Sequence, residues 1–593
     1  MIREKDVIRL IRACLNEPSL TVSRFVELID SDSMLSPWDK KAFSKVVNKS
    51  LGAGPITETG IAGFADTLVY EASSVEYMYF VAKLLEKNQL KQRAYNLYIL
   101  CFDNGMKSLN LVIRLGKIAF ELGDKSAYKA WLKEAIDLYG LICRENKVSD
   151  AINAESIIYE SLIKLVEDDE HVTSAFTKLG IHTQNVTKKV QDKAPFNATA
   201  ITPEIANRIA FCVPNGVMLA HTTVLISILS LYSSEPAFDI CPTIFVVGGI
   251  CDENFRNACD EALIPYVYIP YDSREFTLDV YAERIEKLRT ELQIRGISRV
   301  VWVSVPSGCS WYLGSRIAAE QAYWTMKFHA QATREIDIFI SCASIWEKEK
   351  IVAGKKWVTG PVTFPDALSQ TDAAKAKAIK SEFPQDAILL GVLARAEKIY
   401  SGEYLEAVSR ILRKHPNTIF LWTGRTKHEG IAKHFDDSGL SGRVQYVGWV
   451  DTATYALVLD VFLETFPFGC GLTAAQALAA GTALVSYRNW STIYGHHLSP
   501  VLDGRAGDFD TLSDIESIFR GEGNLDRLLM AKDPEQYVEL ASSVVQSPDF
   551  RESVGEAGKI FYRKYLGNPR ISAQRFAEIF MGSIDNSHHI RKR

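Results

Sequence analysis

Apolar residues recur three and four positions apart through the first third of the chain, where the strict alternation of a strand is absent. Polar breaks such as Asn104-Gly105 and Gly123-Asp124 separate the periodic segments. Periodicity of this kind is typical of amphipathic helices, and the breaks mark the turns between them. The pattern predicts an all-α domain over residues 1–195.

One stretch of this domain, from Leu111 to Gly140, carries the small residues Gly116, Ala119 and Ala127 where two helices can pack closely. It resembles a single tetratricopeptide-type hairpin. A solenoid needs several such units to bury its faces, so the sequence favours an irregular helical bundle.

Beyond a polar segment with two prolines, Thr187 to Pro203, the rhythm changes to short apolar runs that alternate with helical segments. This change predicts a domain boundary and then a doubly wound α/β domain over residues 204–375. Its expected strands are Arg208 to Val213, Thr243 to Val247, Tyr266 to Ile269, Arg299 to Val305 and Ile336 to Ser341. Its expected helices begin near Ala220 and cover Asp279 to Gln293 and Ser315 to Thr325.

After a connecting segment that contains WVTGPVTFPDALSQ, a second α/β set predicts another domain over residues 385–593. Its expected strands are Ala387 to Leu393, Thr418 to Trp422, Arg443 to Tyr446, Val461 to Phe466 and Ala483 to Tyr487. Helices are expected over Glu403 to Lys414 and Thr452 to Leu459, from Thr473 onward, and from about Asp510 to the end. Two such domains in tandem predict a cleft, with ligands outside the carboxyl ends of the strands.

Composition narrows the class of ligand. The 593 residues are 47% hydrophobic and 23% charged, and the net charge is −5, so no overall basic field favours nucleic acid. A phosphate ligand would need local cations. The ten cysteines form no CxxC pair and no Cys/His cluster, so we expect no metal site. Inside apolar runs, four of them are expected to be reduced core thiols: Cys101, Cys212, Cys241 and Cys342.

Neither a targeting signal nor a membrane anchor is expected. The first residues, MIREKDVIRLIRACLNEPSL, carry charges every few positions and lack an apolar core. The longest apolar stretch, Met218 to Tyr232, is too short to span a bilayer. We therefore expect no membrane span and a cytoplasmic protein.

The stretch VFLETFPFGCGLTAAQALAAGTALVSY, from Val461 to Tyr487, reads as strand, glycine turn, helix and strand. Gly469 and Gly471 at such a turn leave backbone N–H groups unpaired at the positive end of a helix dipole, where an anion can bind. The alternative is that these glycines only relieve steric strain.

Three other strand ends in the same domain carry candidate ligands. Arg395 and Lys398 follow the first strand three residues apart, and a diphosphate would neutralise both. Alternatively, both are solvated loop cations. Gly424 and Gly448 end the next two strands and allow a ligand to approach the backbone. The Thr473 hydroxyl can bind the same diphosphate.

The segments LARAEKIY, IFLWTGR, RVQYVGW and DVFLETFPFGCGLTAAQALAAGT together resemble the carboxyl-terminal lobe of a GT-B glycosyltransferase. The most similar clan holds O-GlcNAc transferase and the soluble bacterial N-glycosyltransferases that glucosylate adhesin asparagines. The resemblance is most specific from Glu464 to Thr482 and more diffuse over residues 200–500. It implies a GT-B fold, in which two Rossmann-like domains face a cleft, preceded by a helical domain.

The resemblance also implies roles for individual residues. Arg395 and Lys398 would contact the donor diphosphate, and Thr473 its β-phosphate. Gln476 stands where the family has an acidic residue near the donor ribose, which leaves the donor's identity open. Phe468 and Gln476 occupy the positions at which retaining enzymes usually carry glutamates, and this departure favours an inverting reaction.

On the acceptor side, His221 is expected at the entrance of a helix and resembles the histidine that GT-B enzymes often carry near the sugar. Such a histidine can bind the sugar or the acceptor or help proton transfer; the alternative is a structural role at the helix start. Lys327 and His329 are expected to help hold the donor phosphates or the acceptor. The neighbouring Trp324 can instead pack the seam between lobes.

The implied function is transfer of a hexose from a UDP-sugar to a protein, such as an adhesin or another surface protein. Lys398 and His221 are the candidate catalytic residues. The nucleotide sugar is a co-substrate, and no cofactor, metal or nucleic acid is expected. Two alternatives stay open: a transferase that acts on a glycan or lipid-linked acceptor, and an inactive helical adaptor with a transferase fold.

Overall fold

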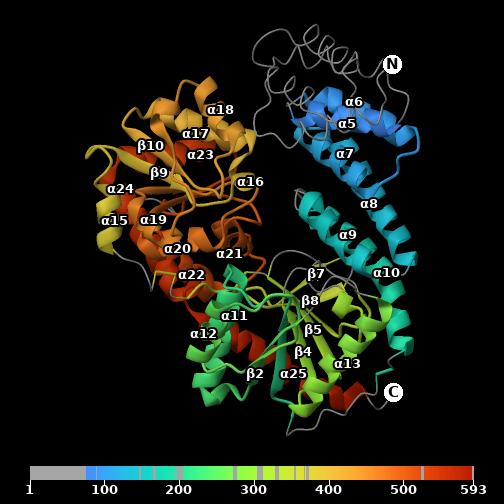
Figure 1. Cartoon of the computed structure of the whole chain (residues 1–593). Coiled ribbons are helices and arrows are strands. Elements are labelled where there is room, and N and C mark those ends of the chain that lie inside the picture. Colours follow the sequence, from blue (N-terminus) through green and yellow to red (C-terminus); the bar gives the residue numbers. More distant parts are fainter. Residues whose placement is uncertain are drawn as a thin grey trace, which may run out of the picture. The chain divides into compact units, whose positions relative to one another are not determined.

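The computed structural model divides the chain into two compact units (Figure 1). One comprises the described residues before Glu167 together with Thr177–Val186, and the other comprises the remaining described residues. The description covers residues 75–590 except 88–89, 146–147, 164–168, 194, 197–204, 271–276, 304–310, 327–332, 343, 353–354, 366, 369–372 and 522–525. The part of the predicted all-α domain before residue 75 therefore lies outside the described residues.

The first unit is built from helices, as predicted for the residues described there. They are α5 (Val75–Lys87), α6 (Lys91–Asp103), α7 (Leu109–Glu121), α8 (Lys125–Arg144), α9 (Val148–Ser161) and part of α10 (Asp169–Lys193). The predicted packing of α7 on α8 involves Gly116, where an added Cβ would lie 3.4 Å from Trp131 Cβ of α8. The same Cβ would lie 2.7 Å from Leu162 Cδ2, so this glycine also lets α7 approach the segment that follows α9.

The second unit contains two sheets, and the first of them has the order β3-β2-β1-β4-β5-β6-β8-β7. All pairs in this sheet are parallel except β7 with β8. Its strands are β1 (Arg208–Val213), β2 (Cys241–Val246), β3 (Tyr266–Tyr268), β4 (Arg299–Val303), β5 (Glu320–Thr325), β6 (Ile338–Ser341), β7 (Glu349–Val352) and β8 (Lys355–Thr359). The helices α11 (Ala220–Ser234), α12 (Glu253–Glu261) and α13 (Leu278–Ile294) connect the first four.

Two predictions for this sheet are wrong. The predicted helix Ser315 to Thr325 is replaced by β5, which pairs with β4 on one side and β6 on the other. A parallel strand buried on both faces shows a continuous apolar run, and a short run of that kind does not separate helix from strand. The hairpin of β7 and β8 occupies a segment that was expected to be a connection.

The second sheet has six strands, all parallel, in the order β11-β10-β9-β12-β13-β14. They are β9 (Ile388–Val392), β10 (Thr418–Trp422), β11 (Val444–Tyr446), β12 (Val461–Leu463), β13 (Ala483–Tyr487) and β14 (Met530–Ala531). From β9 the strand order proceeds to β10 and β11 on one side and to β12, β13 and β14 on the other, so the topological switch point lies where β9 and β12 end.

Helices connect and cover the strands of the second sheet (Figure 1). They are α15 (Ala373–Lys380), α16 (Ala396–Ile399), α17 (Gly402–Lys414), α18 (Glu429–Asp437), α19 (Thr452–Val458), α20 (Leu472–Ala480), α21 (Ile493–Leu502), α22 (Phe509–Phe519), α23 (Pro534–Gln546) and α24 (Pro548–Phe561). The prediction of a helical tail from about Asp510 is wrong at β14, a two-residue strand that pairs with β13.

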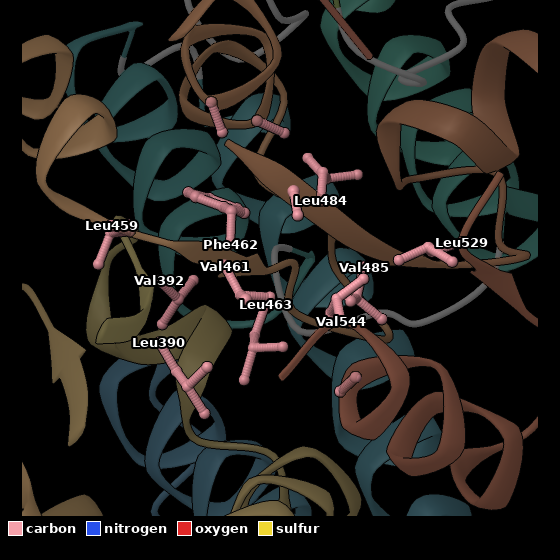
Figure 2. Packing of buried hydrophobic residues seen from close by; sticks show 14 of the residues in the cluster. Leu390, Val392, Leu459, Val461, Phe462, Leu463, Leu484, Val485, Leu529 and Val544 are labelled. Carbon is pink, nitrogen blue, oxygen red and sulfur yellow. The ribbon is translucent and has the colours of Figure 1, made fainter. Parts of the chain in front are cut away.

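Figure 2 shows the core around β12, where Val461 and Leu463 lie among side chains of the neighbouring strands. Val461 pairs with Leu390 of β9, and Leu463 pairs with Val485 of β13. All four side chains are buried. The strand that leads into the glycine turn is therefore fixed from both sides.

The last helix, α25 (Pro569–Ile590), packs against the first sheet. Phe576 and Trp324 stack edge to face with ring centroids 4.3 Å apart, and the Tyr232 hydroxyl donates to the Ala573 carbonyl at 2.7 Å. Trp324 is thus a core residue of the first sheet.

Among the predicted core thiols, Cys101, Cys212 and Cys342 are buried. The prediction is wrong for Cys241, which is exposed because it is the outermost residue of β2. Within the part of the chain that the structure describes, no helix combines the length and the apolarity needed to cross a membrane.

Candidate functional site

The carboxyl ends of β9, β10 and β11 are joined by hydrogen bonds. The Thr423 hydroxyl, just after β10, donates to the carbonyl of Ala394, just after β9, at 3.0 Å. The Gly424 amide donates to the Gly448 carbonyl at 3.2 Å, which ties β10 to the end of β11. The predicted ligand positions Gly424 and Gly448 therefore lie side by side.

Arg395 and Lys398 lie at the switch point, on the short helix α16. Arg395 is its N-cap residue, is exposed, and makes no ion pair with any described residue. Lys398 lies one turn further on, and its ammonium donates a hydrogen bond to the carbonyl of Gly469. This bond joins the end of β9 to the glycine turn after β12. The predicted contact of both strand ends with one diphosphate stays a prediction.

Burial lowers the pKa of the Lys398 ammonium, and the nearby charge of Arg395 lowers it further. The Cys470 thiol and the Glu464 carboxyl act in the opposite direction. Two cations so close together repel one another, and an added anion would relieve that repulsion. The electrostatics of the switch point therefore favour an anionic ligand.

The glycine turn leads into α20, whose first amides are unpaired. Gly471 is the N-cap residue with φ of 52° and ψ of −108°, a conformation that favours glycine, and it makes no side-chain cap. The N–H groups of Gly471, Leu472 and Thr473 have no hydrogen-bond partner among the described residues. The Thr473 hydroxyl reaches the Cys470 carbonyl at 3.5 Å. Unpaired amides at a helix start are donors suited to a phosphate.

Glu464 is a residue of this turn to which the sequence reading gave no role. It follows β12 directly and is fully buried. Its carboxylate accepts hydrogen bonds from the amides of Cys470 at 3.1 Å and Ile493 at 3.0 Å, and from the Ser486 hydroxyl at 2.7 Å. The available signal was a carboxylate inside the apolar run VFLETF, because a charge there has to be paired once the strand is buried.

Burial raises the pKa of the Glu464 carboxyl from its ordinary value of 4.5 to about 7. Its hydrogen bonds and the charge of Lys398 act in the opposite direction but do not cancel this effect. The phenols of Tyr404, Tyr494 and Tyr537 also face the carboxyl group, and burial raises the pKa of each of them, so they remain neutral. Lys398 is the charged side chain that opposes this rise of the Glu464 pKa.

Trp449 and Arg425 form an exposed platform beside the glycines of β10 and β11. The guanidinium carbon of Arg425 lies 5.4 Å from the centroid of the Trp449 ring, and 67% of Trp449 is exposed. A flat, exposed ring of this kind can stack on a planar group of a ligand.

Gln476 lies on α20 but is 8% exposed, and its amide donates to the Ala367 carbonyl at 3.5 Å. Its oxygen has no hydrogen-bond partner among the described residues. Gln476 is therefore a buried side chain of α20 with one oxygen still available as an acceptor.

His221 lies in the first turn of α11, on the first sheet. The hydrogen bond to the backbone amide at this helix start comes from Thr222, whose hydroxyl accepts from Leu219 at 2.8 Å. Thr222 thus caps this helix start, and both the functional and the structural role of His221 stay predictions. Lys327 and His329 lie outside the described residues.

The first six strands of each sheet have the same doubly wound order. Solved structures of other proteins resemble this architecture. The fold is similar to that of an O-GlcNAc transferase mutant from Thermobaculum terrenum, with a TM-score of 0.53 and 13% identity over 93% of this chain and 100% of that chain. The chain therefore has the GT-B fold, as the sequence predicted.

Two further solved structures match a smaller share of the chain with lower scores. A glycosyltransferase from Rickettsia africae has a TM-score of 0.44 and 12% identity over 64% of this chain and 99% of that chain. Anabaena HepE, in complex with UDP and glucose, has a TM-score of 0.44 and 11% identity over 63% of this chain and 99% of that chain. No model of a protein family and no curated protein sequence matches the chain.

Proposed function

We propose that this GT-B protein is a glycosyltransferase that moves a hexose from a UDP-sugar to a protein acceptor. The second sheet binds the nucleotide sugar at its switch point. The diphosphate accepts hydrogen bonds from the amides at the start of α20 and is neutralised by Arg395 and Lys398. The O-GlcNAc transferase to which the fold is similar transfers a sugar as well.

One observation supports this proposal most directly. Unpaired backbone amides and positively charged side chains lie together at the ends of β9 and β12. The amides of Gly471, Leu472 and Thr473 are unpaired among the described residues, and Lys398 is hydrogen-bonded to Gly469 just before them. A nucleoside diphosphate brings both the negative charge and the acceptor oxygens that such a set needs. A solvated loop cation would not require Lys398 to be bonded to the turn.

The chemistry follows from where charge develops. The acceptor atom attacks the anomeric carbon, the bond from that carbon to the phosphate oxygen breaks, and UDP leaves with the bonding electrons. The acceptor's proton passes to a general base, for which His221 is the candidate. Lys398, Arg395 and the α20 amides stabilise the charge that grows on the departing diphosphate, which is electrostatic catalysis.

Two finer features belong to the proposal. The reaction inverts the anomeric centre, because Phe468 and Gln476 stand where retaining relatives carry glutamates. It needs no divalent metal, because the cations and the helix dipole already neutralise the leaving group. The neutral Thr473 hydroxyl adds a further donor for the β-phosphate.

The direct test measures UDP release from UDP-glucose, UDP-galactose and UDP-GlcNAc, with intact-mass analysis of candidate acceptor proteins. We expect release with at least one donor and a gain of one hexose mass on a protein. The anomeric configuration of the product, read by NMR, tests inversion, and the rate in EDTA tests metal independence.

Each outcome of this test supports one of the candidate functions. Release with sugar found on a glycan or lipid would replace the protein acceptor but keep the transferase. The absence of release from any UDP-, GDP- or dTDP-sugar would contradict the proposed function and support an inactive adaptor.

A further inference from the structure

We propose that Glu464 is a positioning residue of the donor site. Its buried carboxylate holds the turn from Phe468 to Gly471 in the shape that leaves the first amides of α20 open to a diphosphate. This inference rests on the proposed function, since it gives a role in donor binding to a residue that does not itself touch the donor.

The carboxylate of Glu464 joins three separate segments: the glycine turn, β13 and the start of α21. Oε1 accepts from the Cys470 amide in the turn and from the Ile493 amide at the start of α21. Oε2 accepts from the Ser486 hydroxyl in β13 at 2.7 Å and from the Ile493 amide at 3.2 Å. The Tyr537 hydroxyl donates to the main-chain carbonyl of Glu464 at 2.9 Å, a bond that does not involve the carboxylate.

The turn is tightly packed at Gly469. A Cβ on Gly469 would lie 2.7 Å from Glu464 Oε1 and 2.2 Å from the Ser491 carbonyl oxygen. The Gly469 amide itself donates to the Ser491 hydroxyl at 3.0 Å. Glu464 and Ser491 therefore clamp Gly469 between them.

This clamp decides which amides remain available. The amides of Gly469 and Cys470 are bonded to Ser491 and Glu464, whereas those of Gly471, Leu472 and Thr473 have no partner among the described residues. The Gly469 carbonyl faces the other way and accepts from Lys398. Loss of the Glu464 acceptor would leave the buried amides of Cys470 and Ile493 unpaired, and the turn would rotate to satisfy them.

The carboxylate works here as a hydrogen-bond acceptor, and this predicts how substitutions differ. In Glu464→Gln, the amide oxygen can still accept from Cys470 and Ile493 while the amide nitrogen donates to the Ser486 hydroxyl. In Glu464→Met, the side chain has similar length but offers those amides no oxygen. The glutamine variant should therefore preserve the turn and the methionine variant should not.

The test is calorimetric titration of UDP into the full-length wild type and these two variants, with hydrogen exchange of the turn peptide. For Glu464→Met we expect about tenfold weaker UDP binding and faster exchange over residues 468–473. For Glu464→Gln we expect affinity and exchange close to those of the wild type.

Tyr537→Phe is the matched control, because it removes a buried hydrogen bond to the same residue but leaves the carboxylate in place. It should lower the melting temperature without changing UDP affinity. Ser486→Ala, which removes one partner of Oε2, provides a milder variant should Glu464→Met fail to fold, and we expect about threefold weaker UDP binding.

Equal UDP affinity in the wild type, Glu464→Met and Ser486→Ala would overturn the positioning role while leaving the proposed function intact. Equal losses in Glu464→Met and Tyr537→Phe would also overturn it, because the effect would then be one of stability alone. A wild type that binds no UDP would instead contradict the proposed function and this inference with it.

Discussion

The two sheets of the second unit have the same order in their first six strands, yet they use cations differently where their strands end. In the first sheet, Arg284 of α13 is 8% exposed and donates to the carbonyls of Val247, Ile269 and Pro270, just beyond β2 and β3. In the second sheet, Arg395 is exposed at the end of β9 and makes no ion pair with any described residue.

The difference shows that, in the same topology, a cation near the strand ends can either stabilise the fold or remain available to bind a ligand. Arg284 uses its donors on backbone carbonyls, and the Tyr312 hydroxyl adds a bond to Val247 at 3.0 Å. The second sheet keeps its donors available, since Arg395 and the first amides of α20 have no such partners among the described residues. Of these two arginines, only Arg395 keeps its guanidinium donors free for a ligand among the described residues.

The largest expected effect is on stability in the first sheet. Replacing Arg284 by Met should lower the unfolding free energy by about 4 kcal/mol, because the carbonyls that lose their donor stay buried. UDP affinity should be unchanged. Chemical denaturation measures the unfolding free energy, and titration with UDP measures the affinity.

Arg395→Met is the matched variant in the second sheet. Its unfolding free energy should change by less than about 0.5 kcal/mol, because the side chain is exposed, whereas UDP binding should weaken about tenfold. If the two arginine variants showed the same pattern, the contrast between the sheets would be lost.

Lys398→Ala should reduce turnover at saturating donor by roughly 10²–10³-fold, the size seen when one donor to a developing anion is removed. Steady-state UDP release measures it. Lys433→Ala, an exposed lysine on α18, is the control and should keep wild-type turnover. Wild-type turnover in Lys398→Ala would remove this lysine from the mechanism.

Stability should depend on pH through Glu464. Its pKa rises from 4.5 in the unfolded chain to about 7 in the fold, so the folded state holds the proton more tightly. The stabilisation is complete below the unfolded pKa and is lost as pH rises through the folded one. Relative to Glu464→Gln, the wild type should lose about 3 kcal/mol between pH 4.5 and 7.5. If the unfolding free energies of the wild type and Glu464→Gln changed equally with pH, the carboxyl would not titrate in this range.

One added methyl group in the turn tests whether the turn is clamped. Gly469→Ala should destabilise the protein by about 2 kcal/mol and weaken UDP binding, because the new Cβ would meet the Ser491 carbonyl. Gly442→Ala has open space around its Cβ and should change neither quantity. A neutral Gly469→Ala would mean that the turn is not clamped.

Much of the fold could be predicted because the strands are short apolar runs between clear breaks. The bounds predicted for Arg208 to Val213, Thr418 to Trp422 and Ala483 to Tyr487 agree with β1, β10 and β13. β5 was mistaken for a helix because a buried central strand lacks alternation. No local pattern shows that α25 packs on the first sheet, since that contact joins residues far apart in the chain.

The site was predictable where backbone and charge act locally. Gly471 at a helix start and Arg395 with Lys398 one turn apart can be read from spacing alone. The role of Glu464 could not, because its partners Ser486 and Ile493 come from other elements and meet it only in the folded sheet. The expected contact of Gln476 with the donor ribose stays a prediction, since its amide nitrogen donates to Ala367 while its oxygen has no partner among the described residues.

The most direct measurement compares the binding of UDP and of uridine to the wild type and to a double variant, Arg395→Met with Lys398→Ala. If the switch point of the second sheet binds the diphosphate, the wild type will prefer UDP strongly and the double variant will bind the two ligands almost equally. A double variant that keeps the wild-type preference for UDP over uridine would contradict this site.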